Sequence, residues 1–267
     1  SMEALINGVH LRYEVHGEGE PVLLVHGFPL SRELWRPLIE PLREQYRLIL
    51  PDLRGHGESE ASAEMSMARY AEDLAALLDH LGERRPVVLV GLSMGGYIGF
   101  EFCRRHPERV RALVLANTRA QADSEEAAQG RRETAEKALR EGSGVVAEGM
   151  MGELFAPDAS GELRERWRGI MAATPAEGVA AALRAMAERP DSFDTLRRLD
   201  GPVLVVAGEE DAVIPVEDAR RMQEAARNAR LELIPGAGHL TPVEQPERFV
   251  ASLRGFLDTL GSSASGS

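Results

Sequence analysis

A serine between two glycines is the first residue whose setting suggests chemistry. Ser93 is the centre of the run Gly91-Leu-Ser-Met-Gly95, which directly follows residues 87–90, all Val or Leu. A sharp turn from a strand into a helix strains its middle residue and brings neighbouring segments close, so it needs small residues beside that position. The turn would place Ser93 at a helix N-terminus, where N–H groups favour a developing negative charge. The pattern predicts a nucleophile, and a plain helix-capping serine is the alternative.

A serine nucleophile needs a base within hydrogen-bond reach, and of the seven histidines His239 has the most suggestive setting. It follows the apolar run 231–234 on a short Gly-rich loop. The carboxyl ends of parallel strands share one edge of a sheet, and α/β folds build their sites there. His26 and His56 lie on loops at the same edge, and we expect them to brace the site through hydrogen bonds. The other histidines lie in the opening hairpin or near helix ends: His10, His16, His80 and His106.

The third member of such a triad holds the imidazole in one tautomer and stabilises its cation. Another apolar run, 203–206, ends in an acidic loop that contains Glu209, Glu210 and Asp211. All three residues carry the same charge at the same predicted edge. Charge and position alone therefore leave the choice among them open.

Acyl transfer also needs two backbone donors for the developing oxyanion. In a turn of this kind, the residue after the nucleophile, Met94, supplies one of them. A His-Gly-Phe-Pro loop follows the apolar run 22–25. Because Pro29 has no N–H, Phe28 is the expected second donor, and a turn without chemistry is the alternative. We expect the side chains of Phe28 and Met94 to contact substrate.

These candidates require strands that bring them to one edge. Residues 5–16 alternate apolar and polar side chains around Asn7-Gly8, which predicts a hairpin. Six later runs of Val, Leu and Ile are separated by segments with helical spacing, the pattern of a parallel sheet covered on both faces. The prediction is an α/β fold with a mostly parallel eight-stranded sheet and helices on both faces. The six runs are 22–25, 48–50, 87–90, 110–115, 203–206 and 231–234.

Residues 118–198 carry no strand signal and are rich in Ala, Glu, Arg and Met at helical spacing. An excursion of this length between two core strands predicts a helical lid inserted after the sixth strand; the alternative is a packed extension without ligand contact. The predicted core is 3–117 and 199–260, and the Gly- and Ser-rich 261–267 is a predicted disordered tail. Apolar lid residues form a candidate acyl or alcohol pocket, although such stripes also pack helices against cores: Met150, Met151, Leu154, Phe155, Trp167 and Met171.

Composition limits the function classes. A formal charge of −12 on 267 residues disfavours binding to nucleic acid or to an anionic membrane, because neutralising phosphates needs a basic face. The single cysteine, Cys103, excludes an intrachain disulfide and a cysteine-based metal cluster. No stretch is long and apolar enough to span a membrane, and no signal pattern precedes the first strand. We expect a cytoplasmic monomer or small homo-oligomer that needs no metal or organic cofactor.

Five motifs together resemble the α/β-hydrolase fold family, and the resemblance covers residues 3–260. The chain order Ser, Asp, His matches that family. Its Gly-x-x-Asp-x-x-x-Pro motif carries the catalytic acid, so the resemblance selects Asp211. The segment 51–59 resembles a loop that borders the active site, with Asp52 and Arg54 in structural roles. The motifs are His-Gly-Phe-Pro at 26–29, Pro-Asp-Leu-Arg-Gly-His-Gly-Glu-Ser at 51–59, Gly-Leu-Ser-Met-Gly-Gly at 91–96, Gly-Glu-Glu-Asp-Ala-Val-Ile-Pro at 208–215 and Gly-Ala-Gly-His at 236–239.

Within the family, the chain is most similar to small bacterial carboxylesterases and 3-oxoadipate enol-lactonases. The resemblance implies an acyl-enzyme route that cleaves small or medium apolar esters; lactones are the alternative substrate, and a non-catalytic ligand-binding protein is the alternative of another class. Epoxide hydrolases and haloalkane dehalogenases carry aspartate where this chain has Ser93. Hydroxynitrile lyases have a site lysine, whereas the only lysine here, Lys137, lies early in the predicted lid. Cofactor-free perhydrolases share the triad, so a peroxide-dependent side activity stays open.

Overall fold

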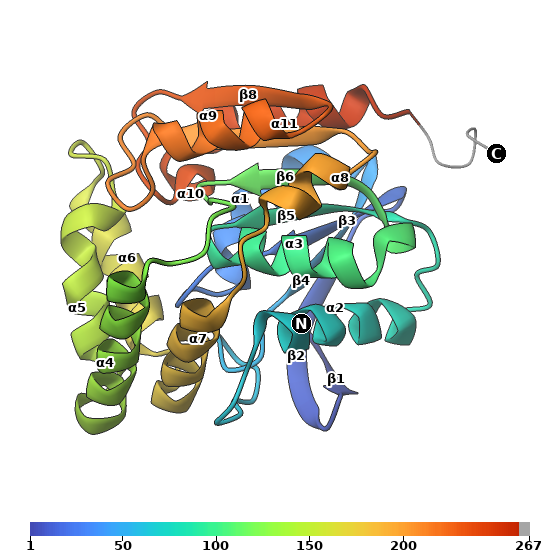
Figure 1. Ribbon diagram of the computed structural model, residues 1–267. Coiled ribbons are helices and arrows are strands. Elements are labelled where there is room, and N and C mark those ends of the chain that lie inside the picture. Colours follow the sequence, from blue (N-terminus) through green and yellow to red (C-terminus); the bar gives the residue numbers. More distant parts are fainter. Residues whose placement is uncertain (262–267) are drawn as a thin grey trace.

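An eight-stranded sheet forms the centre of the molecule in the computed structural model, which describes residues 1–261 (Figure 1). Apart from Gly261, the predicted tail 261–267 lies outside the described residues. The strand order across the sheet is β1-β2-β4-β3-β5-β6-β7-β8. The strands are β1 (Met2–Ile6), β2 (Val9–His16), β3 (Glu20–Val25), β4 (Tyr46–Pro51), β5 (Val87–Leu92), β6 (Val110–Ala116), β7 (Val203–Gly208) and β8 (Ala229–Ile234).

The first two strands form the predicted hairpin, and the rest of the sheet is parallel. Asn7 and Gly8 have φ angles of 49° and 87°, as a two-residue hairpin turn with two left-handed positions requires. β1 pairs antiparallel with β2, and β2 pairs antiparallel with β4. All pairs from β3 to β8 are parallel. The predicted fold class is confirmed; β1 begins at Met2, one residue before the expected start of the core.

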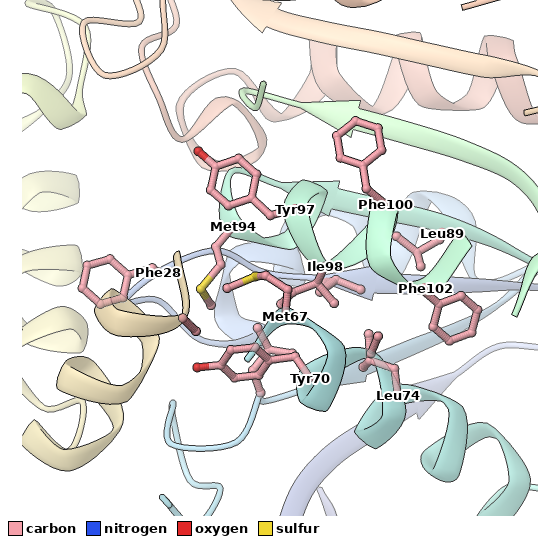
Figure 2. Packing of buried hydrophobic residues seen from close by; sticks show 14 of the residues in the cluster. Phe28, Met67, Tyr70, Leu74, Leu89, Met94, Tyr97, Ile98, Phe100 and Phe102 are labelled. Carbon is pink, nitrogen blue, oxygen red and sulfur yellow. The ribbon is translucent and has the colours of Figure 1, made fainter. Parts of the chain in front are cut away.

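Helices cover both faces of this sheet and bury two apolar clusters against it. On one face the cluster contains Trp35, Leu38, Phe249 and Leu253, which belong to η1, α1 and α11. On the other face the cluster includes side chains of α2 and α3, and Figure 2 shows Leu74 of α2 beside Phe102 of α3. The helices that cover the sheet are η1 (Arg32–Trp35), α1 (Arg36–Leu42), α2 (Met67–His80), α3 (Met94–Arg105), η2 (Pro107–Arg109), α8 (Phe193–Arg198), α9 (Val216–Ala225), α10 (Thr241–Glu244) and α11 (Pro246–Asp258).

Four further helices stand together at one end of the sheet (Figure 1). In the chain they come after β6 and before β7. They are α4 (Glu125–Glu141), α5 (Ser143–Leu154), α6 (Gly161–Ala172) and α7 (Ala176–Glu188); α4 packs on α7 and α5 on α6. The candidate pocket residues Leu154, Trp167 and Met171 are at most 1% exposed and belong to the cluster on the α1 and α11 face. These three side chains therefore take part in packing, the use that the sequence left as the alternative to a pocket.

A buried arginine ties the two ends of this helical segment together. The Arg189 guanidinium, just after α7, donates to Asp123 Oδ1 at 2.7 Å and to the carbonyl oxygens of Gln121 and Met186 at 3.0 Å. It also stacks on the Tyr97 ring, with Cζ 3.9 Å from the ring centre. The Asp123 side chain is 1% exposed. The chain leaving β6 and the chain returning to β7 are thus fixed to each other and to α3.

Replacing Arg189 by Met is expected to lower the free energy of unfolding by roughly 3 kcal/mol, because it leaves a buried carboxylate and two carbonyls with fewer donors. Arg131 still pairs with Asp123, so the loss lies at the low end for a buried pair. Arg184→Met is the matched control: its bond to Glu136 is exposed, and such pairs contribute about 1 kcal/mol or less. Urea unfolding of both variants checks the difference. Equal losses of unfolding free energy in the two variants would contradict a stabilising role for the buried Arg189 contacts.

Candidate active site

Ser93 lies at the turn between β5 and α3, in a backbone conformation that strains a non-glycine residue. Its φ is 57° and its ψ is −116°, and such positions cost about 1–3 kcal/mol. The turn is tight enough to exclude side chains beside it. A Cβ at Gly91 would lie 2.2 Å from the Gly95 carbonyl oxygen, and a Cβ at Gly95 would lie 2.2 Å from that of Val25. The two glycines of the motif therefore let the nucleophile candidate stand clear of β5.

Asp211 and His239 are joined by a hydrogen bond at the same edge of the sheet. Nδ1–H of His239 donates to Oδ2 of Asp211 at 2.9 Å, and the two side chains are 3% and 1% exposed. This bond leaves Nε2 as the ring nitrogen that can accept a proton. Burial alone would raise the pKa of Asp211; the neighbouring His239 and the N–H donors around it outweigh burial, and the pKa lies below its usual value.

The glutamates that competed with Asp211 do not share this environment. Glu209 and Glu210 are exposed, whereas Asp211 Oδ1 accepts the backbone N–H groups of Val213 and Ile214 at 2.8 and 3.0 Å. A carboxylate held by its own loop and hydrogen-bonded to an imidazole can orient that imidazole. The geometry therefore favours Asp211 among the three.

Asn117, which directly follows β6, is a site residue that the sequence analysis missed. Its Nδ2 donates to Asp211 Oδ2 at 3.0 Å and to the Gly238 carbonyl oxygen at 3.1 Å. Its Oδ1 accepts from the Thr241 hydroxyl at 2.8 Å. The side chain thus joins the acid loop to the loop that carries the histidine. Its position at a strand end, on the edge that holds the other candidates, is the signal that could have found it.

The serine turn is held to the same edge by the residues around Asn117. The Ser93 N–H donates to the Ala116 carbonyl oxygen at 2.9 Å, and the Thr118 hydroxyl donates to the Ser93 carbonyl oxygen at 2.7 Å. Ser93, Asp211 and the loop of His239 are therefore all bound to the three residues 116–118. Sequence distance separates the candidates, but the end of β6 brings them together.

The Ser93 hydroxyl and His239 Nε2 are not hydrogen-bonded to each other. Within residues 1–261 neither atom makes a hydrogen bond with ordinary distance and angles. Ser93 is half-buried and His239 is 2% exposed. Without substrate, contacts between nucleophile and base are often long and tighten only when the reacting complex forms. The bond from base to acid is present, and the bond from nucleophile to base is not.

Phe28 and Met94 have the free backbone donors that an oxyanion site needs. In the described part of the chain, neither N–H donates to any acceptor. The loop before Phe28 lies against the serine turn, since a Cβ at Gly27 would be 3.2 Å from Ser93 Cβ. The Phe28 side chain is 8% exposed, but that of Met94 is 0% exposed and points into the cluster that contains Met67 and Tyr70 (Figure 2).

Two buried histidines support the loops at this edge. His26 Nδ1–H donates to the Gly27 carbonyl oxygen at 2.8 Å, and Nε2 accepts the Leu53 N–H at 3.0 Å. The His56 ring lies edge-on to Phe28, with 6.4 Å between ring centres, and Nδ1 bonds to the Arg54 carbonyl oxygen at 3.1 Å. Burial lowers the pKa of His26 to about 4 and that of His56 to about 3. Both rings are therefore neutral in the folded protein near pH 7.

The two motif residues of the 51–59 loop with expected structural roles are both ion-paired. Asp52 accepts from the Arg32 guanidinium and from the Arg32 and Glu58 backbone N–H groups. Arg54 donates two bonds to Asp73, at 2.9 and 2.7 Å. Burial raises the pKa of Asp52 even though these donors oppose it. The side chains of Asp52 and Arg54 thus bond to buried parts of the fold.

The buried histidines make stability fall as the pH is lowered from about 6.5 towards 4. An unfolded imidazole binds a proton near pH 6.5, but the folded rings stay neutral to about pH 4 and 3. In that window the unfolded state binds more protons, so each ring lowers the unfolding free energy by up to about 1.4 kcal/mol per pH unit. Urea unfolding between pH 7 and 5 measures the slope. His56→Phe removes one of the two titrating rings, so stability should fall less steeply with decreasing pH in this variant. An unchanged slope would contradict the prediction.

Among residues 1–261, no group of three His, Cys, Asp or Glu side chains could hold a metal ion. In the same range, no helix has the length and apolar character needed to cross a membrane. A cavity of about 650 Å³ lies over α2 and the end of α3, lined by Arg54, Arg69, Glu72 and Arg105 among others. It contains none of the triad candidates, and several of its charged side chains are paired: Arg105 with Glu72, Arg109 with Asp79, and Arg54 with the buried Asp73.

Comparison with known proteins agrees with this architecture. Residues 20–246 match the family described as alpha/beta hydrolase fold. The putative 2-succinyl-6-hydroxy-2,4-cyclohexadiene-1-carboxylate synthase of Bacillus subtilis (strain 168) is 32% identical over 94% of this chain and 96% of its own length. The 3-oxoadipate enol-lactonase 2 of Acinetobacter baylyi is 32% identical over 90% of each chain. The solved structure of a thermophilic esterase from Thermogutta terrifontis is 43% identical and superposes with a TM-score of 0.94, covering 97% of this chain and 98% of that one. The chain belongs to the α/β-hydrolase fold family.

Proposed function

We propose that this hydrolase cleaves carboxylic esters through an acyl-enzyme, with Ser93 as nucleophile, His239 as general base and Asp211 as the acid that orients the histidine. One observation carries the proposal. The hydrogen-bonded pair of Asp211 and His239 lies at the sheet edge that also holds a strained serine. A binding protein has no need of an imidazole held by a buried carboxylate beside such a serine.

The proposed reaction has two steps. Ser93 Oγ attacks the ester carbonyl while His239 Nε2 takes its proton, and the same proton passes to the leaving alcohol. Water then attacks the acyl-serine with His239 as base, releasing the acid and restoring the hydroxyl. The free N–H groups of Phe28 and Met94 would stabilise the oxyanion of both tetrahedral intermediates. No step needs a metal or an organic cofactor.

We propose small or medium apolar esters as substrates. The arginine that reaches α3 near the serine turn, Arg189, has its guanidinium bound to Asp123 and two carbonyl oxygens. It is therefore engaged in the fold and is poorly placed to bind a substrate carboxylate. A panel of p-nitrophenyl esters tests this point, and a strong preference for highly charged acyl groups would contradict it.

The helical segment 118–198 is proposed to cover the site as a lid. Two contacts support this role. The His239 N–H donates to the Leu154 carbonyl oxygen at the end of α5, at 3.0 Å. Gly178 of α7 touches the 51–59 loop so closely that a Cβ there would lie 2.1 Å from the Gly55 carbonyl oxygen.

Labelling by a fluorophosphonate probe tests the proposal against non-catalytic ligand binding. The folded protein should react once, at Ser93, because an activated serine attacks phosphorus as it attacks an ester carbonyl. The modified peptide is identified by mass spectrometry. A folded protein that stays unlabelled would favour the binding alternative.

Lactone hydrolysis is the second candidate activity, favoured by the 32% identity to a 3-oxoadipate enol-lactonase. The same triad opens a lactone by the same two steps, except that the alcohol stays attached to the acyl group. Comparing kcat/KM for a lactone and for a linear ester of equal carbon number separates the candidates. A lactone preference of more than about tenfold, which is about 1.4 kcal/mol in the barrier, would make lactonase the main activity.

A further inference from the structure

The side chain of Glu244 folds back from α10 onto the loop that carries His239. Its Oε1 accepts the Gly238 N–H at 3.0 Å, and its Oε2 accepts the Leu240 N–H at 2.9 Å. One carboxylate therefore holds the backbone N–H of the residue before the histidine and that of the residue after it. Charge-assisted bonds of this kind are about twice as strong as neutral ones.

The helical segment completes this arrangement. The N–H of His239 itself donates to the Leu154 carbonyl oxygen at 3.0 Å, so three successive N–H groups, 238 to 240, all have fixed acceptors. Oε1 of Glu244 also accepts the Ala156 N–H at 2.8 Å. The same carboxylate thus binds both the histidine loop and the chain that leaves α5.

This contact depends on a glycine in front of the histidine. A Cβ at Gly238 would lie 2.7 Å from the Ala156 nitrogen and 2.9 Å from the Phe155 carbonyl carbon. The backbones at 238 and 156 therefore approach more closely than any other residue type allows. This close approach lets one carboxylate oxygen reach both N–H groups.

Within residues 1–261 Glu244 forms no salt bridge with a Lys or Arg side chain. Burial raises the pKa of its carboxyl, although the N–H groups of Ala156, Gly238 and Leu240 and the nearby His239 imidazole pull the other way. Glu244 is half-buried, and removing a carboxylate from water costs free energy that its backbone donors must offset. The geometry it imposes here is that of the residue proposed as the base.

We propose that Glu244 is a positioning residue for His239: it fixes the N–H groups of both neighbours of the histidine and joins them to the chain that leaves α5, which sets where Nε2 stands relative to Ser93. This inference rests on the proposed function, since it assigns Glu244 a role through the proposed base. Asp211 controls the tautomer of the ring, and Glu244 controls where the ring stands. An error of about 1 Å in such a position costs on the order of 100-fold in rate.

Glu244→Ala is expected to lower kcat on a p-nitrophenyl ester by about 10- to 100-fold and to change KM by less than about threefold, because a misplaced base weakens the chemical step more than substrate binding. The kcat of Glu244→Gln should lie between that of Glu244→Ala and that of the wild type. Its amide oxygen can still accept from Gly238 and Ala156, but its NH₂ group faces the Leu240 N–H. The near-isosteric Gln keeps the test valid if the Ala variant folds poorly.

Burst titration of reactive serine corrects each rate for the folded fraction. Glu247→Ala is the matched control: this exposed glutamate in the first turn of α11 should leave kcat and KM unchanged. An unchanged kcat in both Glu244 variants, or a raised KM at constant kcat, would overturn the positioning role. A wild-type protein that neither labels nor turns over would instead overturn the proposed function.

Discussion

Ser93→Ala should lower kcat on a short-chain p-nitrophenyl ester by several orders of magnitude, on the order of 10⁴-fold or more, because the acyl-enzyme cannot form without the hydroxyl. The folded structure should survive. Alanine keeps the Cβ and therefore the strain at φ 57°, and within residues 1–261 the hydroxyl makes no hydrogen bond that the change would break. Initial rates at saturating substrate, together with unfolding midpoints, check both expectations.

Ser66→Ala is the matched control for that experiment. Ser66 is exposed and caps α2, where its side chain accepts the Arg69 N–H at 3.0 Å. Its loss should cost about 1 kcal/mol of stability and leave kcat intact. A Ser93 variant that stays as active as the Ser66 variant would remove Ser93 from the mechanism.

The fold could be predicted from the sequence because its strands leave few alternatives. Residues such as 87–90 are apolar at every position, which suits a strand buried on both faces, and β5 is buried throughout. Asn7-Gly8 predicted the hairpin for an equally local reason. The strand order could not be derived in this way: placing β4 between β2 and β3 depends on how helices pack, which no local pattern records.

The site residues likewise include some that local sequence patterns predict and some that they do not. Ser93, Asp211 and His239 follow apolar strands, so their common edge was predictable from the parallel sheet. Asn117 and Glu244 were missed because each has a partner that is distant in the sequence: Asn117 bonds to Asp211 94 positions away, and Glu244 bonds to Ala156 88 positions away. In the sequence, Asn117 is a single amide after a strand, and Glu244 is one of many acidic residues on helices. Only packing distinguishes them from a surface residue.

Asp211→Asn is expected to reduce kcat by about 10⁴-fold, the scale seen when a triad carboxylate becomes an amide. Both oxygens of Asp211 only accept: Oδ1 from Val213 and Ile214 N–H, and Oδ2 from the His239 ring and the Asn117 amide. An asparagine offers one accepting oxygen and one donating NH₂. Two backbone N–H groups hold the oxygen at the Oδ1 position, so the NH₂ faces the imidazole.

The histidine then accepts at Nδ1 and carries its proton on Nε2, where it can no longer take the proton of Ser93. Nitrogen NMR of the imidazole should show the changed tautomer while the fold stays intact. Glu209→Gln and Glu210→Gln are the controls, because these exposed neighbours have the same charge without the contacts and should keep full activity. If either of them, rather than Asp211, abolished turnover, the acid would have been assigned to the wrong residue of the loop, and the hydrogen bond between Asp211 and His239 would have only a structural role.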